Sequence, residues 1–89
     1  MRGRMPEISR FLGIAIYMYY RDHEPPHFHA EYGEFEITVE IEKGVVFGRF
    51  PRRALSLVLE WCLLHKADLL TDWERAAAKL SLNRIPPLE

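Results

Sequence analysis

The tetrapeptide Tyr32-Gly33-Glu34-Phe35 constrains the fold of this chain more tightly than any other short segment. Glycine at the first central position of a two-residue turn supplies the positive φ angle that a tight β-hairpin requires. Such a turn pairs the strand that ends at Tyr32 with the strand that begins at Phe35 in one register, because the turn length fixes it. The sequence therefore predicts a β-hairpin at Gly33.

The predicted register places apolar residues on one face of the hairpin and polar residues on the other. The apolar face pairs Tyr32 with Phe35, Ala30 with Ile37 and Phe28 with Val39, and the polar face pairs Glu31 with Glu36, His29 with Thr38 and His27 with Glu40. This sorting supports the register, because a shift by one residue would exchange the faces. We therefore expect a core face and a second face that presents His27, His29 and Glu31 to solvent.

The flanking segments complete a small α+β fold. Residues 11–20 are apolar on both alternating faces and rich in β-branched and aromatic types, which favours a central strand. A turn at residues 42–45 allows a fourth strand to return with Ile41 near Val46. Residues 52–82 contain no glycine or proline and carry an apolar stripe at helical spacing, which predicts one long helix or two helices that meet near Lys66.

These signals predict one domain, because a second hydrophobic core would not fit in a chain of 89 residues. The expected fold is a three- or four-stranded antiparallel β-meander packed against a long C-terminal helix or helix pair. We expect a flexible start at residues 1–5, a sheet within residues 11–50, helical structure over residues 51–82 and an extended tail at residues 83–89.

Composition and charge exclude several classes of protein. No segment reaches the roughly 18 apolar residues of a membrane span, and the start lacks the apolar region of a signal peptide, so we expect a cytoplasmic protein. The single Cys62 agrees with a reducing compartment. Acidic residues gather in 22–42 and basic residues in 43–53, which argues against a continuous nucleic-acid surface but allows a local anion site.

The histidines carry the strongest chemical signal in the chain. His27 and His29 lie two residues apart on a predicted strand, so both imidazoles project from one face, with Glu31 at the next step. This ligand set suits zinc, iron or manganese, and His23 can reach the same site from the preceding connector. The residues also suit general acid–base chemistry, in which two histidines take opposite protonation states. A third interpretation is a solvated face on which the imidazoles only pair with nearby carboxylates.

Three arginines form a candidate phosphate anchor: Arg49, Arg52 and Arg53. Cations at the start of a helix oppose its dipole, so they are unexpected there unless they meet an anion or an acidic neighbour. Ion pairing with the acidic hairpin is the favoured alternative, because structural ion pairs are commoner than catalytic ones. His65, further along the helical segment, is expected to pack or cap there, with Asp68 one turn away.

The assembled motifs give the chain a resemblance to a bacterial family, domain of unknown function 4160. The motifs are Met5-Pro6-x-Ile8, Asp22-His23-x-Pro25-Pro26-His27-Phe28-His29-Ala30-x-Tyr32-Gly33, Pro51-x-x-Ala54-Leu55, Glu60-Trp61, His65-x-x-Asp68-Leu69-Leu70-x-x-Trp73 and Ile85-x-Pro87-Leu88. The resemblance covers nearly the whole chain from Met5, and Pro-Pro-His-x-His is its most distinctive part. It brings no established catalytic residue. The matching positions that can bear chemistry are Asp22, His23, His27, His29, His65 and Trp73.

The resemblance implies a role in small two-gene bacterial modules. Such proteins commonly occur beside a second family, domain of unknown function 2442, and have been proposed as toxin–antitoxin-type pairs. Together with the histidine row, it leads to the hypothesis of a toxin-like component bound by the product of a neighbouring gene. On this hypothesis the candidate catalytic residues are Asp22, His23, His27 and His29. Whether the chain is an enzyme stays open.

Two other functions remain. One is a non-enzymatic binding module, the antitoxin or scaffold half of the pair, in which the apolar helix face and the tail at residues 85–88 bind the partner. The other is a protein that binds a divalent transition metal. Leu57, Leu63 and Leu64 fall outside the helical stripe, which indicates burial by the folded-back tail or by a second copy of the chain in a homodimer.

Overall fold

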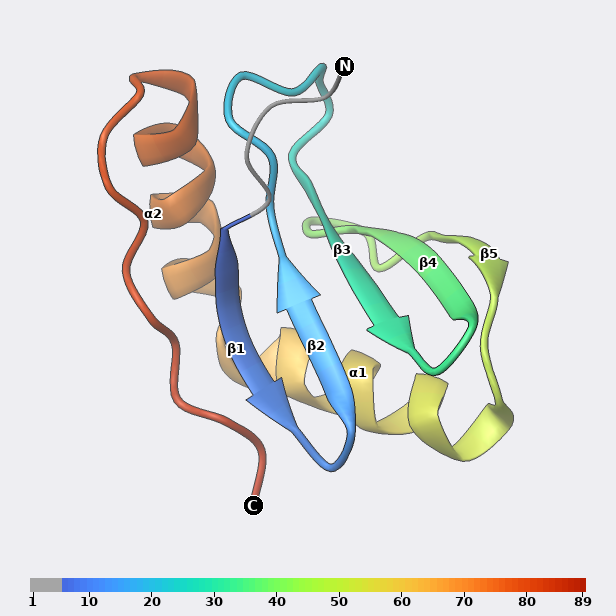
Figure 1. Ribbon diagram of the computed structural model, residues 1–89. Helices are drawn as coiled ribbons and strands as arrows, with labels where there is room; N and C mark the ends of the chain where they lie inside the picture. The colour runs from blue at the N-terminus through green and yellow to red at the C-terminus, as the bar shows by residue number, and fades with distance from the viewer. Residues whose placement is uncertain (1–5) are drawn as a thin grey trace.

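An antiparallel sheet in which each strand pairs with the next along the chain forms one layer of the protein, and a helical layer covers one of its faces (Figure 1). The computed structural model describes residues 6–89. The strands are β1 (Glu7–Phe11), β2 (Ile14–Tyr17), β3 (His27–Tyr32), β4 (Phe35–Glu40) and β5 (Val46–Arg49), followed by the helices α1 (Arg52–Leu64) and α2 (Lys66–Ala77). The predicted α+β class is confirmed, and the sheet has five strands instead of three or four. The predicted flexible start at residues 1–5 lies outside the described residues.

The additional strand exists because residues 11–20 contain a turn. Leu12 and Gly13 have φ angles of 52° and 82°, and positive φ at both central positions is what a type I′ hairpin turn requires. The preceding residues therefore fold back as β1, with Phe11 opposite Ile14. The prediction of one central strand over residues 11–20 is wrong, and the sheet begins at Glu7.

The central hairpin has the predicted register in all its pairs, from Tyr32 opposite Phe35 to His27 opposite Glu40. Gly33 has a φ of 58°, as the turn requires. In the next hairpin Val46 lies opposite Val39, two residues before Ile41. β4 ends at Glu40, and the turn closes where the Gly44 N–H donates to the Glu40 carbonyl at 2.8 Å.

Two helices, not one, follow the sheet, and they meet at His65, one residue before the predicted point. α2 ends at Ala77, so the prediction of helical structure to residue 82 is wrong. Lys79 adopts a φ of 62°, and the Leu80 N–H donates to the Arg75 carbonyl at 2.8 Å. A left-handed residue followed by this hydrogen bond is the Schellman motif, which stops a helix. None of the helices in residues 6–89 is long and apolar enough to span a membrane.

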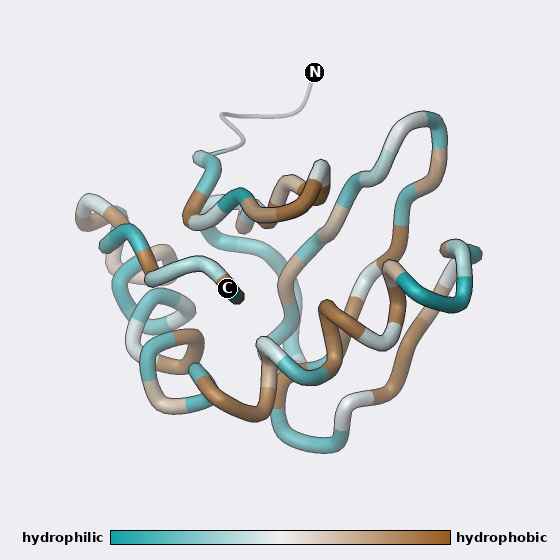
Figure 2. Tube along the Cα trace, turned by 90° about the horizontal axis from the view of Figure 1, so that it is seen from below, coloured by the Kyte–Doolittle hydropathy of each residue, from teal (hydrophilic) through white to brown (hydrophobic). Residues whose placement is uncertain are grey.

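The hydrophobic core lies between the helices and the face of the sheet that carries Phe28 and Ala30, which we call the helix face. The Phe28 and Trp61 rings meet edge to face, with centroids 5.6 Å apart. Burying these side chains removes roughly 25 cal/mol of unfavourable hydration per Å² of apolar surface. Hydrophobic and polar residues alternate along the chain (Figure 2), and the strands direct their polar positions to the opposite side, the open face.

The C-terminal tail runs extended beside β1 and does not extend away from the domain (Figure 1). The Ile85 N–H donates to the Ile8 carbonyl at 2.8 Å, and the Trp61 indole N–H donates to the Pro86 carbonyl at 2.9 Å. Buried Asp72 accepts the Asn83 N–H at 2.8 Å. The outer edge of β1 is therefore covered, whereas β5 ends the sheet on the other side.

We predict that Ile85→Ala destabilises the protein by about 2 kcal/mol or more, because truncating a buried isoleucine removes apolar contacts and leaves a cavity. Ile85 is 4% exposed, whereas the control Leu80 is 50% exposed. Leu80→Ala is expected to change the free energy of unfolding by about 0.5 kcal/mol at most. Urea denaturation followed by tryptophan fluorescence measures both changes. Equal changes for the two variants would show that the tail does not dock in solution.

Candidate functional site

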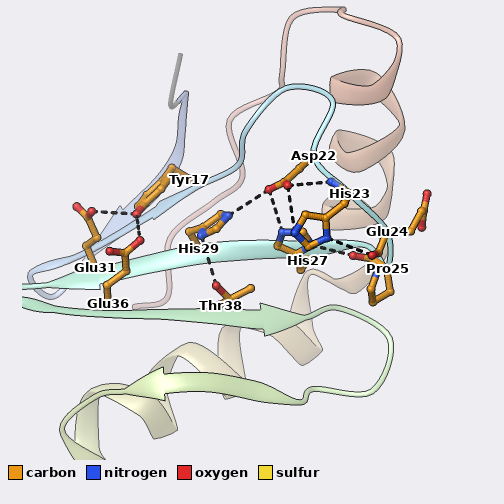
Figure 3. Close-up of polar contacts among 10 residues, drawn as sticks. All are labelled: Tyr17, Asp22, His23, Glu24, Pro25, His27, His29, Glu31, Glu36 and Thr38. Carbon is orange, nitrogen blue, oxygen red and sulfur yellow. Dashed lines mark hydrogen bonds and ion pairs between the residues drawn. The ribbon is translucent and has the colours of Figure 1, made fainter. Parts of the chain in front are cut away.

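Three polar side chains converge on the open face: Asp22, His27 and His29, which we call the Asp–His cluster. The two histidines project from β3 on the side away from Phe28, because residues two apart on a strand share a face. The segment between β2 and β3 arches back over them and brings Asp22 onto the imidazoles (Figure 3). Its position is tied to α2, since the Arg21 N–H donates to the Ala76 carbonyl at 3.3 Å.

One carboxylate oxygen contacts both imidazoles. Asp22 Oδ2 lies 3.0 Å from His27 Nε2 and 3.4 Å from His29 Nε2. The donor atoms of the three residues all lie within 4.8 Å of one another. Asp22 therefore stands where the sequence interpretation expected Glu31 to complete the set.

The histidines lie on the predicted face, but the prediction that this face presents them to solvent is wrong. His27 is 5% exposed and His29 is 8% exposed. The Tyr17 ring stacks on His29 at 5.3 Å between centroids, and the Trp73 ring contacts His27 at 5.1 Å. Neighbouring aromatic side chains and the Asp22 segment thus shield imidazoles that a bare sheet would have left open.

The outer ring nitrogens are also held by the protein. His27 Nδ1 lies 2.8 Å from the Pro25 carbonyl oxygen, which can only accept, so this nitrogen carries a proton and donates. His29 Nδ1 lies 3.5 Å from the Thr38 hydroxyl. If His27 is neutral, its Nε2 lone pair faces Asp22 Oδ2 at 3.0 Å, which is repulsive. A proton on one of the two atoms, or a cation bound to both, removes this repulsion.

The electrostatics keep Asp22 ionised and favour neutral His29. Burial alone would raise the pKa of Asp22, but the His23 backbone N–H at 2.8 Å and the contacts with the two buried histidines outweigh burial and lower it. Burial lowers the pKa of His29, and its hydrogen bond with Asp22 opposes this only in part. An ionised carboxylate beside a neutral imidazole is the ligand combination that divalent transition metals bind.

The cluster opens into a pocket of about 380 Å³. The residues that line it are Asp22, His23, Pro25, His27, His29, Thr38, Glu40 and Phe47. His23 has an exposed side chain at the mouth, with Nε2 3.7 Å from Asp22 Oδ1. The four residues predicted to be catalytic, Asp22, His23, His27 and His29, therefore share one pocket.

Glu31, predicted as a metal ligand, belongs to a separate group. Its Oε2 lies 2.9 Å from the Tyr17 hydroxyl, and Glu36 Oε2 lies 2.8 Å from the same hydroxyl (Figure 3). Burial and the two carboxylates raise the pKa of the Tyr17 phenol well above its usual range, so the hydroxyl stays protonated. Tyr17 therefore separates two like charges that face each other across the hairpin.

The predicted phosphate anchor does not join the pocket. Arg49 lies on β5 opposite Glu36, and Arg52 and Arg53 begin α1, all three with exposed side chains. None of them lines this pocket or makes an ion pair within residues 6–89, so the structure does not show the expected ion pairing with the acidic hairpin.

His65 packs on the helices as predicted. Its ring lies 5.6 Å from the Trp61 ring, and its Nδ1 lies 3.4 Å from Asp68 Oδ2. It does not belong to the Asp–His cluster. Residue spacing did not identify Asp22 as a member of the cluster, because Asp22 lies in a loop and the periodicity of strands and helices does not describe the path of a loop.

The fold and the pocket define a small α+β protein with a carboxylate–histidine cluster on the open face of a β-meander. The chain matches the family described as Domain of unknown function (DUF4160) over residues 13–74, which is 62 of its 89 residues. It therefore belongs to this family. Searches of curated proteins and of solved structures found no match.

We predict that Tyr17→Phe lowers the free energy of unfolding by about 1–2 kcal/mol at pH 7, because two carboxylates lose their shared hydrogen-bond donor. Tyr32→Phe is the matched control, since the Tyr32 hydroxyl makes no side-chain hydrogen bond within residues 6–89 and the residue is 37% exposed. Urea denaturation measures both variants. A loss as small as that of the control would show that the hydroxyl does not stabilise the hairpin.

Proposed function

We propose that this protein binds a divalent transition metal through Asp22, His27 and His29. The convergence of three donor atoms within 4.8 Å carries the proposal. Two imidazoles and one carboxylate are a common ligand set for zinc and for non-haem iron. A metal ion bound to both His27 Nε2 and Asp22 Oδ2 would remove the repulsion between their lone pairs, as a shared proton also would.

The donor spacing fits a metal ion. With bonds of about 2.0–2.1 Å, adjacent ligands of a tetrahedral zinc site lie about 3.3 Å apart. The two Asp–His separations of 3.0 and 3.4 Å are close to that value. The donor set therefore needs little rearrangement around Asp22 to accept an ion.

The surroundings of the cluster support the same proposal. Metal-binding histidines usually donate the outer ring N–H to a carbonyl or carboxylate, which fixes the ring and leaves the inner nitrogen free to coordinate. Pro25 supplies such a carbonyl to His27, and the Thr38 hydroxyl lies beside the outer nitrogen of His29. Backbone and side-chain partners thus orient both Nε2 atoms toward Asp22.

The pocket adds a reactive position to the proposed site. Three protein ligands leave a fourth position of a tetrahedral ion for water or substrate, whereas structural zinc sites are closed by four protein ligands. A bound metal would lower the pKa of a water molecule or polarise a substrate oxygen. Here the cluster faces a pocket that opens to solvent. A site that acts on a substrate is therefore favoured over a purely structural one.

We predict that zinc binds the purified, untagged protein with near one-to-one stoichiometry, and that alanine at Asp22, His27 or His29 weakens binding at least about 100-fold. Thr38→Val is expected to weaken it about 10-fold, as for other groups that orient a metal ligand. His65→Ala is the control, because this histidine does not belong to the Asp–His cluster. Isothermal titration calorimetry measures affinity, and the absorption of the Co²⁺ form reports coordination. Wild-type protein without metal affinity, or a His65 variant as impaired as the His29 variant, would contradict the site.

We further propose that the Asp–His cluster is the active centre of a toxin-like half of a bacterial two-gene pair. The family resemblance suggests the pairing, with a product of the neighbouring gene, such as a member of domain of unknown function 2442, as partner. The burial of two histidines against a partly buried carboxylate beside a pocket supports an active role. Such groups cost stability and are concentrated at functional sites.

We predict that overexpression of the protein in its host slows growth and that the His27→Ala/His29→Ala double variant abolishes the effect. Coexpression of the neighbouring gene is expected to restore growth. The growth rate at matched protein level is the measurement, with His65→Ala, outside the Asp–His cluster, as the control that keeps toxicity. Unimpaired growth with wild-type protein, or toxicity that survives the double substitution, would refute the catalytic-toxin role.

A non-enzymatic binding module is the competing function, and one observation indicates where such a module would bind its partner. Leu63 and Leu64 are 79% and 65% exposed at the end of α1, whereas the tail proposed for partner binding already packs on its own domain. Copurification with the neighbouring gene product that survives loss of His27 and His29, but is lost on Leu63→Ser/Leu64→Ser, would support it. Dissociation to monomers by the same leucine substitutions would identify a homodimer instead.

A further inference from the structure

Phe47 is an exposed aromatic residue on a polar face. It is 64% exposed, although a phenylalanine of this size is usually covered by other side chains. Its neighbour Val46 packs against the core, so alternation along β5 turns Phe47 to the open face. Its ring makes no aromatic contact within residues 6–89. The fold itself would accept a polar residue at this position.

The ring stands at the rim of the proposed metal pocket. Phe47 pairs with Thr38 across β4 and β5, and the Thr38 hydroxyl lies beside His29, so the phenyl ring is two strands from the cluster. Pro25 lines the same pocket from the segment before β3, and its ring is also exposed. The pocket therefore combines a polar site of three donors with two apolar wall residues. Such a pocket suits a ligand that is polar at one end and apolar at the other.

Charge narrows the class of ligand. Glu40 lines the pocket together with Asp22, and Glu31 and Glu36 lie further along the same face. The neighbouring cations there are Arg10 and Arg49, so the carboxylates on this face outnumber them. A divalent ion neutralises two carboxylates and leaves no excess positive charge to hold phosphates. Phosphate backbones need several cationic contacts, so nucleic acid fits this face poorly.

Resting on the metal site proposed above, we infer that Phe47 is a substrate-contact residue that selects a small ligand with a flat apolar ring and a metal-binding oxygen. The ring of the ligand stacks on Phe47, while its oxygen reaches the ion held by Asp22, His27 and His29. A volume of about 380 Å³ has room for one ring and its polar group. Phe47 therefore determines which metal-binding ligands have high affinity, and it is not itself a metal ligand.

The zinc-loaded protein and two hydroxamic acids test this inference. Acetohydroxamic and benzohydroxamic acid offer the metal the same pair of oxygens, and only the second carries a ring. We expect wild-type protein to bind benzohydroxamic acid about 10-fold more tightly than acetohydroxamic acid, because aromatic stacking and buried apolar area both contribute. This preference should shrink to about 2-fold in Phe47→Ala and be intermediate in Phe47→Leu, which keeps apolar area without a π-face.

The variants also separate failure of this inference from failure of the proposed function. Zinc affinity, measured first by calorimetry, should be the same in wild type and Phe47→Ala. Leu63 on α1 is also an exposed apolar residue but lies outside the pocket, so Leu63→Ala should keep the full preference for the ring-bearing ligand. Zinc binding without a ring preference, or a preference that survives Phe47→Ala, overturns the role of Phe47 alone. Absence of zinc binding in wild type overturns the metal site and the inference together. Tight binding of a ten-nucleotide oligothymidylate at 0.1 M salt would overturn the ligand class.

Discussion

The pairing register of β3 on β4 is the constraint on which the rest of the molecule depends. It sends Phe28 and Ala30 to the core and His27 and His29 to the opposite face, and a slip by one residue would exchange the two sets. Gly33 fixes this register locally, through a turn that needs a positive φ angle. Core formation and site formation are consequently not independent, because one hydrogen-bonding pattern specifies both.

The cluster on the open face has a cost that the surrounding structure must offset. An ionised carboxylate is partly removed from water at Asp22, and two imidazoles are almost fully buried beside it. Backbone groups stabilise this arrangement: the His23 N–H donates to Asp22, and the Pro25 carbonyl accepts from His27. Contacts from α2 through Trp73 and Ala76 hold the same region from a second side. The site therefore rests on contacts from the sheet and from the final helix, although its residues are close in sequence.

Local turn chemistry made the central part of the fold predictable from sequence. Gly33 indicates the hairpin turn. The alternation of apolar and polar residues around it then assigns the two faces of the hairpin, without information from the rest of the chain. Two of the errors in the predicted fold share one cause, which is left-handed backbone at residues that seldom adopt it. Leu12 begins the unpredicted hairpin, and Lys79 ends α2 early, both without a helix-breaking or glycine signal at that position.

The candidate site was predictable only as far as strand geometry reaches. The shared face of His27 and His29 follows from their spacing, whereas Asp22 arrives through a loop whose path no periodicity describes. Their burial was also missed, because it comes from Tyr17 on one strand and Trp73 on a distant helix. Glu31 satisfied the spacing rule and yet turned to the Tyr17 hydroxyl, which shows that a row of ligand types on a strand is not by itself a site.

The two edges of the sheet differ, and this difference has a geometric consequence. The tail occupies the flank of β1, where Ile85 hydrogen-bonds to Ile8, while β5 leaves the opposite margin without a neighbour within residues 6–89. An additional strand can therefore pair with β5, the edge strand that carries Phe47, but not with β1. Two chains joined there would leave only tail-covered margins, so polymerisation by strand addition would stop at a pair.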